Sequence, residues 1–141
     1  MSAAPVHIVK RLSVPAEVVF DAWTLGNVMK LWLFKSDTNE ILHLKADLQP
    51  GGAFSILEQS DDGSLIDHFG RYHEIERPHH LSFSLEAPKH FSGVTEVDIH
   101  IMPTARGCEL TFDQTGVDPQ IVEESWHKMF SRLDKVLNKA L

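Results

Sequence analysis

Nine histidines are a high number for a chain of 141 residues, and imidazoles can bind metals or transfer protons near neutral pH. A zinc site would show a recognisable ligand set, such as His-Glu-x-x-His or two Cys/His pairs. No such set occurs in the sequence, so most of the histidines are expected to be solvated or structural. The sequence therefore predicts no metal site and no cofactor.

One histidine lies close to the only tyrosine, in the segment IDHFGRY. In a strand, His68 and Tyr72 would share a face with Ile66 and Gly70. If that face points inward, the two side chains provide the few polar anchors that an apolar cavity needs. The opposite parity remains an alternative, and it would bury Phe69, Arg71, His73 and Ile75. A buried imidazole could also act as a general base, but spacing provides no orienting partner, so no catalytic residue is predicted.

Two carboxylates and one thiol complete the reactive side chains that we considered. Asp47 and Glu58 flank a turn, and paired carboxylates can perform acid–base chemistry, as in glycosidases. The favoured interpretation places them on solvent faces or in ion pairs with Lys45 and Arg71. The chain's one cysteine, Cys108, excludes an internal disulfide and is expected to be a buried structural thiol.

A glycine-rich turn in the stretch KADLQPGGAFSI could be a phosphate-binding loop or a hairpin. A phosphate loop needs a helix directly after it, and a Gly-Lys-Ser/Thr signature. Here the following residues alternate as a strand does, and that signature is missing. The pattern therefore predicts a hairpin, with Pro50 at its entry and Gly51 or Gly52 in a positive-φ conformation.

The remaining pattern predicts a meander of strands closed by a long helix. Pro15 suits the start of a first helix, Gly26 is expected to end it, and Asn27 is expected to cap a second short helix. Alternation and turn signals predict strands at 6–14, 40–48, 53–59, 64–76, 80–87, 93–103 and 108–116.

The closing helix follows Asp118 and Pro119, which suit its N-cap and its first position. Its apolar stripe has the 3.6-residue period of a helix packed on a sheet and comprises Val122, Trp126, Met129, Phe130, Leu133, Val136 and Leu137.

Composition narrows the class of protein. Hydrophobic residues make up 43% of the chain and charged residues 23%, so a packed core is expected, and the length suggests one domain, residues 1–141. A net charge of −7 without a basic stripe argues against nucleic-acid binding. No signal peptide or apolar run long enough to span a membrane is apparent, so a cytoplasmic location is expected.

Taken together, these motifs resemble the START-like, or SRPBCC, superfamily, and within it the branch named after the activator of heat-shock-protein ATPase. The resemblance covers roughly residues 6–140. It rests on Val14-Pro15 with VVFDAW, on Trp32 in the second short helix, and on the segments ADLQPGGAF, GRYHEIERPHHLSFS and SWHKMFSRLDKVL. The chain departs from the family pattern at Gln49, where the family usually has arginine, and at Ser125 and Cys108.

The resemblance implies an α+β helix-grip fold, in which a curved antiparallel sheet of about seven strands grips the last helix around an apolar cavity. It implies binding of a small hydrophobic molecule. The predicted ligand-binding residues on the sheet and helices are Trp32, Phe54, His68, Tyr72, Phe83, Val97, Ile99, Phe112, Trp126, Met129, Phe130 and Leu133.

Two other functions remain open, so whether the chain is an enzyme is uncertain. One is a cyclase- or hydrolase-type enzyme that uses the same cavity. The other is a co-chaperone-like module that binds another protein through an exposed apolar patch. An exposed edge strand could also pair two copies, which makes a homodimer a further expectation.

Overall fold

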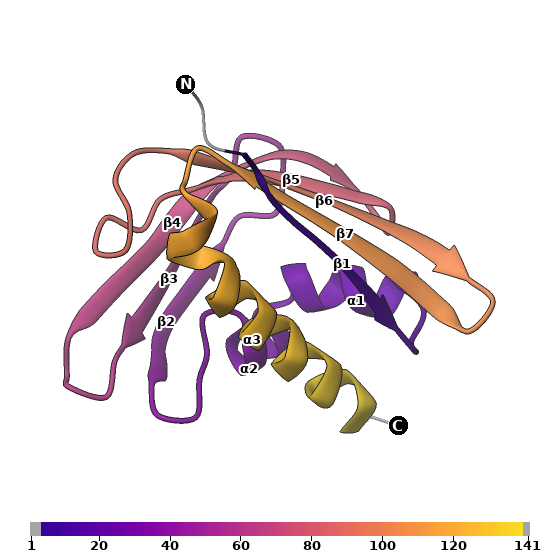
Figure 1. Ribbon diagram of the computed structural model, residues 1–141, viewed down its shortest axis with the longest axis horizontal. Helices are drawn as coiled ribbons and strands as arrows, with labels where there is room; N and C mark the ends of the chain where they lie inside the picture. Colours follow the sequence, from indigo (N-terminus) through magenta and orange to yellow (C-terminus); the bar gives the residue numbers. More distant parts are fainter. Residues whose placement is uncertain (1–3, 140–141) are drawn as a thin grey trace.

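The computed structural model describes residues 4–139 (Figure 1). The first part of the chain forms β1 (Val6–Leu12), α1 (Ala16–Thr24) and α2 (Gly26–Trp32). Six strands follow: β2 (Glu40–Ala46), β3 (Ala53–Gln59), β4 (Leu65–Glu76), β5 (His80–Leu85), β6 (Thr95–Thr104) and β7 (Gly107–Thr115). The chain closes with α3 (Pro119–Lys139).

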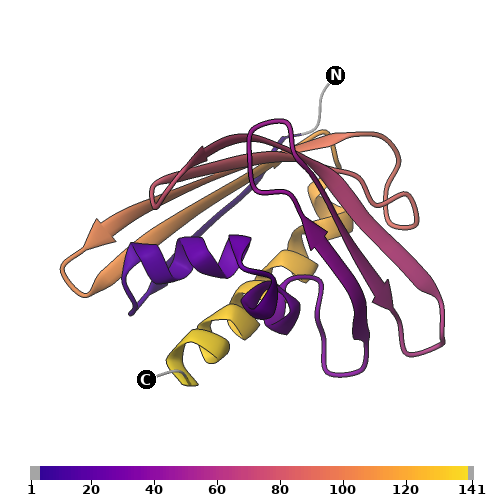
Figure 2. The same ribbon diagram turned by 180° about the vertical axis from the view of Figure 1, so that it is seen from behind.

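The seven strands form one antiparallel sheet in the order β1-β7-β6-β5-β4-β3-β2. The sheet is curved, and all three helices lie on its concave side (Figures 1 and 2). The long helix α3 runs beneath the arch. This is the predicted α+β helix-grip architecture.

The core fills the space between the sheet and α3. Residues of the predicted helical stripe are buried, with Val136 partly so, and they pack against inward side chains of β5, β6 and β7. Asp118 accepts a hydrogen bond from the backbone N–H of Gln120 at 3.0 Å, which confirms the predicted N-cap. Burial of this stripe provides most of the driving force that holds helix and sheet together.

The junction between the two short helices differs from its prediction. Helix α1 ends at Thr24, and Gly26 begins α2 instead of ending α1. Leu25 is the N-cap of α2 and makes no side-chain hydrogen bond there, so Asn27 lies inside the helix. Leu25 is the single residue between the two helices, and its backbone is extended. Its N–H bonds to the carbonyl of Asp21 at 2.8 Å, and its carbonyl accepts the first hydrogen bonds of α2.

The glycine-rich turn is a hairpin, as predicted. Gly51 has φ = 82°, which a side chain would strain, and the turn joins the antiparallel strands β2 and β3. The N–H of Gly51 bonds to the carbonyl of Tyr72 at 2.7 Å, and the N–H of Tyr72 bonds to the carbonyl of Gly52 at 2.9 Å. The turn therefore extends the pairing of β3 with β4.

The first strand ends at Leu12 instead of residue 14, because the chain bends there toward α1. Among the helices of residues 4–139, none is both long and apolar enough to cross a membrane.

Candidate functional site

A cavity of about 240 Å³ lies where the N-terminal half of α3 meets β3, β4 and β5. Its lining surface is mainly apolar, and five of the lining residues can titrate: Lys35, Glu58, His68, His90 and Lys128. It is lined by Phe34, Lys35, Ser36, Asn39, Glu58, His68, Leu85, His90, Phe91, Gln114, Ile121, Val122, Ser125, Trp126, Lys128 and Met129. Two larger depressions, of about 640 and 670 Å³, are lined mostly by exposed polar residues. We take the smaller cavity as the candidate site, because it alone of the three contains a buried ionisable pair.

The buried pair consists of Glu58 and His68. In the β3–β4 ladder His68 lies opposite Ile56, so Glu58, two residues further along β3, projects from the same face as a diagonal neighbour. The Oε1 atom of Glu58 is 2.9 Å from Nε2 of His68, and the two side chains are only 14% and 4% exposed. The other ring nitrogen of His68, Nδ1, is buried and has no hydrogen-bond partner.

Asn39 holds the other oxygen of this carboxylate. Its Nδ2 atom donates to Oε2 of Glu58 at 2.8 Å and to the carbonyl oxygen of Phe34 at 2.8 Å. Its Oδ1 atom accepts a bond from the backbone N–H of Ser36, also at 2.8 Å. Asn39 is itself buried, so one side chain fixes both the loop after α2 and the orientation of Glu58.

Phe34 covers the imidazole. Its ring lies parallel to that of His68, with centroids 3.8 Å apart and an angle of 7° between the planes. The backbone of Phe34 has φ = 57°, an unfavourable conformation for a residue other than glycine. Its N–H donates to Sδ of Met129 at 3.1 Å, which helps hold the residue in place. Strained residues of this kind concentrate at functional sites, which supports the choice of this cavity.

The surroundings of Glu58 and His90 determine the charge that each side chain carries. Burial acts to raise the pKa of Glu58, but the hydrogen bonds from His68 and Asn39 outweigh burial and hold the pKa below its usual value. Burial, with a smaller contribution from His68, lowers the pKa of His90. Near neutral pH the cavity therefore contains an ionised carboxylate beside a neutral imidazole of His90.

The opposite wall comes from α3 and rests on a buried polar chain. Trp126 donates its indole N–H to Oε1 of Gln114 at 2.9 Å. Nε2 of Gln114 donates to Oγ1 of Thr95 at 3.0 Å, and that hydroxyl donates to the carbonyl of Leu85 at 2.7 Å. Gln114 and Thr95 are fully buried, and this chain fixes the orientation of the tryptophan at the cavity.

Only three of the twelve residues predicted from the sequence line this cavity: His68, Trp126 and Met129. The other nine are buried in the core, away from its lining: Trp32, Phe54, Tyr72, Phe83, Val97, Ile99, Phe112, Phe130 and Leu133. A ligand-binding role for any of the twelve stays a prediction.

The structure shows which face of β4 points inward, a question that the sequence left open. Ile66, His68, Gly70 and Tyr72 are the buried set. Tyr72, however, packs between Phe54 and Phe83, with ring centroids 5.4 and 6.2 Å away, and does not join His68 at the cavity.

The other thirteen lining residues were not predicted as ligand-binding residues, and four of them shape the polar end of the cavity: Phe34, Asn39, Glu58 and His90. The interpretation of Glu58 as a solvent-facing residue or a partner of Lys45 or Arg71 was wrong, since its partners are His68 and Asn39. The signal was present, because Glu58 has the same strand parity as the buried Phe54 and Ile56. His90 lies on the loop after β5, and no periodicity could have placed it.

Comparison with known proteins gives one family match. The model of the family described as Activator of Hsp90 ATPase homolog 1-like protein matches residues 13–138. A comparison with curated proteins gives no match.

Solved structures with the same fold include three proteins of low sequence identity. A protein from Rhodobacter sphaeroides has a TM-score of 0.84 at 17% identity, with 99% of this chain and 98% of that one covered. An AHSA1-like protein from Aeromonas hydrophila, solved by NMR, has a TM-score of 0.84 at 20% identity, with 97% and 94% covered. A protein from Nitrosomonas europaea has a TM-score of 0.81 at 21% identity, with 96% and 95% covered.

Proposed function

This chain belongs to the Activator of Hsp90 ATPase homolog 1-like family, and we propose that it binds a small, largely apolar molecule in the cavity between α3 and strands β3 to β5. The single observation that carries the proposal is the buried Glu58–His68 pair at one end of an otherwise mainly apolar cavity. Ligand sites are typically apolar concavities with a few fixed polar groups, and this cavity has that composition.

The size and charge of the cavity limit the ligand. A volume of about 240 Å³ is slightly smaller than the roughly 300–1,000 Å³ of common ligand pockets, which favours a compact molecule such as a single substituted ring. Lys35 and Lys128 also line the cavity, but Lys35 donates to the carbonyls of Ser36 and Asn39, and Lys128 lies 3.5 Å from Glu124. The ionised Glu58 therefore disfavours an anionic group beside it. The polar end of the ligand is therefore expected to be a hydroxyl or amide that can donate to Glu58 or exchange hydrogen bonds with His90.

Two matched ligands test the charge argument. We expect para-ethylphenol to bind, measured by calorimetry and by backbone amide shifts in NMR spectra, and para-ethylbenzoate to bind at least about tenfold more weakly because of the repulsion from Glu58. Native mass spectrometry of protein purified from its own host would identify the class of any natural ligand directly.

Two serines of α3 provide a matched pair of variants. Ser125 lines the cavity, whereas Ser131 is exposed on the same helix and away from it. Ser125→Phe should fill the mouth of the cavity and abolish binding of para-ethylphenol, while Ser131→Phe should leave it unchanged. Equal binding by both variants would place the ligand elsewhere and refute the proposal.

An enzyme is the second candidate, because Glu58 is the orienting partner that a catalytic histidine needs. In this reading the carboxylate accepts a hydrogen bond from Nε2–H of His68, and Nδ1 acts as the general base on a ligand in the cavity. His68→Gln would then abolish turnover of a co-purifying molecule while leaving its affinity within about tenfold. A pure binding protein would show no turnover in the parent protein.

The name of the family suggests a third candidate, contact with the Hsp90 ATPase. The Ser125→Phe variant separates this candidate from the first, because a chaperone-binding surface would not require an open cavity. Hsp90 binding that survives in Ser125→Phe, together with no binding of small molecules by the parent protein, would favour the interaction module.

A further inference from the structure

We propose that Glu58, His68 and His90 form a binding site for one divalent transition-metal ion at the polar end of the cavity. Each residue offers one ligand atom, and the three atoms lie within 4.8 Å of one another. The proposal uses the same cavity as the proposed ligand-binding function, but metal binding does not require the organic ligand.

The three donors come from three different segments. Glu58 lies on β3, His68 on β4, and His90 on the loop between β5 and β6. Ligands of a tetrahedral metal with bonds of about 2.1 Å lie roughly 3.4 Å apart. The Glu58 and His68 atoms are 2.9 Å apart, and the donor atom of His90 lies within 4.8 Å of both. His90 is exposed, so rotation of its side chain can bring that atom closer.

The surroundings of the donors resemble those of metal ligands. One carboxylate and two imidazoles suit zinc and neighbouring first-row ions such as cobalt and iron. Asn39 donates to the Oε2 atom of Glu58 at 2.8 Å and so orients the carboxylate, as outer hydrogen bonds do in metal sites. The loop that carries Asn39 is fixed in turn by its bonds to Phe34 and Ser36.

A second observation concerns the tautomer of His68, which no second hydrogen bond fixes. His68 is 3% exposed, and its Nδ1 atom has no hydrogen-bond partner although buried polar atoms nearly always have one. The ring stacks on Phe34, and the tilted ring of His90 lies 5.6 Å away between centroids. With its hydrogen on Nδ1, the imidazole presents the lone pair of Nε2, the nitrogen beside Glu58, to a cation.

Three protein ligands leave the remaining coordination positions open. Structural zinc sites use four protein ligands, whereas sites that act on other molecules keep at least one position free. The mainly apolar cavity is the space next to these three residues. An oxygen atom of the cavity ligand would complete the coordination, which makes the metal the anchor of the ligand's polar end.

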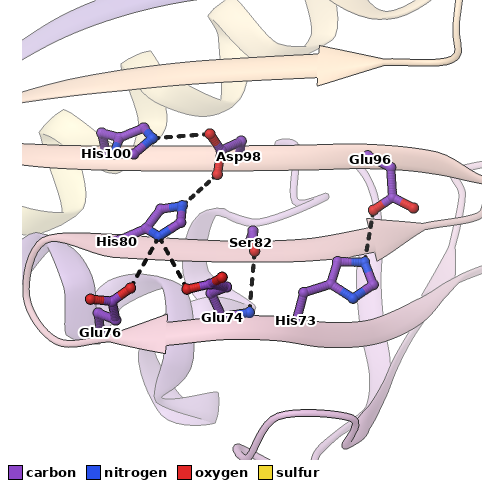
Figure 3. A network of polar contacts seen from close by, with 8 residues as sticks. All are labelled: His73, Glu74, Glu76, His80, Ser82, Glu96, Asp98 and His100. Atoms are coloured by element: carbon purple, nitrogen blue, oxygen red, sulfur yellow. Dashed lines mark hydrogen bonds and ion pairs between the residues drawn. The ribbon is translucent and has the colours of Figure 1, made fainter.

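A second group of similar residues lies on the outer face of the sheet and provides the control (Figure 3). His80, Asp98 and His100 also place three donor atoms within 4.8 Å. Here the side chains of Asp98 and His100 are 46% and 50% exposed, and they do not line any of the three depressions described above. Its two imidazoles already bond to the same carboxylate, Asp98.

Titration with Co²⁺ tests the assignment, because its visible absorption reports both stoichiometry and geometry. The metal-free parent chain should bind one Co²⁺ with the intense visible band of a four-coordinate site. His90→Ala should weaken that binding at least about tenfold, and Asn39→Ala, which removes the support of Glu58, should weaken it about tenfold or more. His100→Ala should leave it unchanged. Because His90 and His100 are both exposed, neither variant is expected to unfold the chain.

The opposite pattern would overturn the proposal. Loss of the cobalt band in His100→Ala but not in His90→Ala would assign the metal to the outer face, and absence of a stoichiometric band in the parent chain would refute both sites. Bound Zn²⁺ should also reverse the ligand preference, so that para-ethylbenzoate binds more tightly than para-ethylphenol. Binding of para-ethylphenol by a chain that binds no cobalt would leave the ligand-binding function standing and remove the metal alone.

Discussion

Trp126 donates its indole N–H to the side-chain carbonyl of Gln114 at 2.9 Å, across the interface between α3 and β7. Both side chains are buried, and both line the cavity. A tryptophan on the gripping helix is thus tied by a directed bond to the sheet, and the orientation of the cavity wall depends on a polar pair inside the core. Breaking this pair should affect stability and the site together.

We expect Gln114→Met to destabilise the fold by about 1–3 kcal/mol. Methionine has a similar shape, but it leaves the N–H of Trp126 without its partner and removes the donor to Thr95. Urea denaturation monitored by tryptophan fluorescence measures the loss. Gln120→Met, at an exposed position of α3, is the control and should stay within about 0.5 kcal/mol of the parent chain. Equal stability of the two variants would show that the bond contributes nothing.

Asn39→Ala should cost about 1–3 kcal/mol, because it removes bonds to Phe34, Ser36 and Glu58 from a buried position. We also expect the amide resonance of Phe34 to move, since its φ of 57° is held by this loop. Thermal unfolding and NMR spectra measure the two effects. Asn27→Ala, at an exposed position in α2, provides the comparison and should change stability little. An Asn39→Ala chain as stable as Asn27→Ala would contradict the role given to this side chain.

The elements were predictable from the sequence, whereas the contacts at the site were not. The helical stripe around Trp126 and the alternation of β4 depend on periods of 3.6 and 2, which neighbouring residues reveal. The Glu58–His68 pair depends on the register of β3 against β4, in which Ile56 faces His68. A slip of one residue would turn Glu58 to the other face, and local pattern does not specify that register.

Residues outside regular elements were harder still. His90 reaches the cavity from a loop, and Phe34 adopts a backbone conformation that its residue type disfavours. Gly26 and Asn27 have the residue types of helix ends, but packing of α1 and α2 against the core places the boundary at Leu25. Tertiary contacts decide such positions, and a single sequence contains no direct record of them.

Tyr72 should ionise only in strongly alkaline solution. Burial raises its pKa from 10.0 to about 12. Since the chain has one tyrosine, the ultraviolet absorption of phenolate reports this group alone. We expect the folded chain to titrate near pH 12 and the unfolded chain near pH 10. Ionisation of Tyr72 near pH 10 in the folded chain would show that the ring is open to solvent.

The raised pKa of Tyr72 also makes the stability of the fold depend on pH. A pKa that is raised in the folded state contributes stability that is complete below the unfolded value and is lost as pH rises through the folded value. Two pKa units correspond to about 3 kcal/mol, so stability should fall by about that amount between pH 10 and 12. Tyr72→Phe should lack this component of the decline, and denaturant unfolding over this pH range measures the difference.

The outer cluster around Asp98 should make His80 a stronger base than a free histidine. Burial acts to lower the pKa of His80, but the hydrogen bond and charge of Asp98, with help from Glu76 and Glu74, raise it overall (Figure 3). The Nε2 atom of His80 is 2.5 Å from one oxygen of Asp98. Because the pKa is raised, the stabilisation is complete below the unfolded value of 6.5 and is lost as pH rises through the folded value.

At low pH, protonation of Asp98 removes the stabilisation that the His80–Asp98 pair provides. Burial acts to raise its pKa, but bonds from His80 and His100 lower it below 3.8, so its contribution is lost as pH falls through that lowered value. The pair should therefore stabilise the sheet most between about pH 4 and 6.5. NMR titration of the imidazole protons should show the pKa of His80 falling in Asp98→Asn. Asp67→Asn, near the opposite end of the neighbouring strand β4, should leave it unchanged. A pKa of His80 that is the same in Asp98→Asn as in the parent chain would mean that the carboxylate is not its partner in solution.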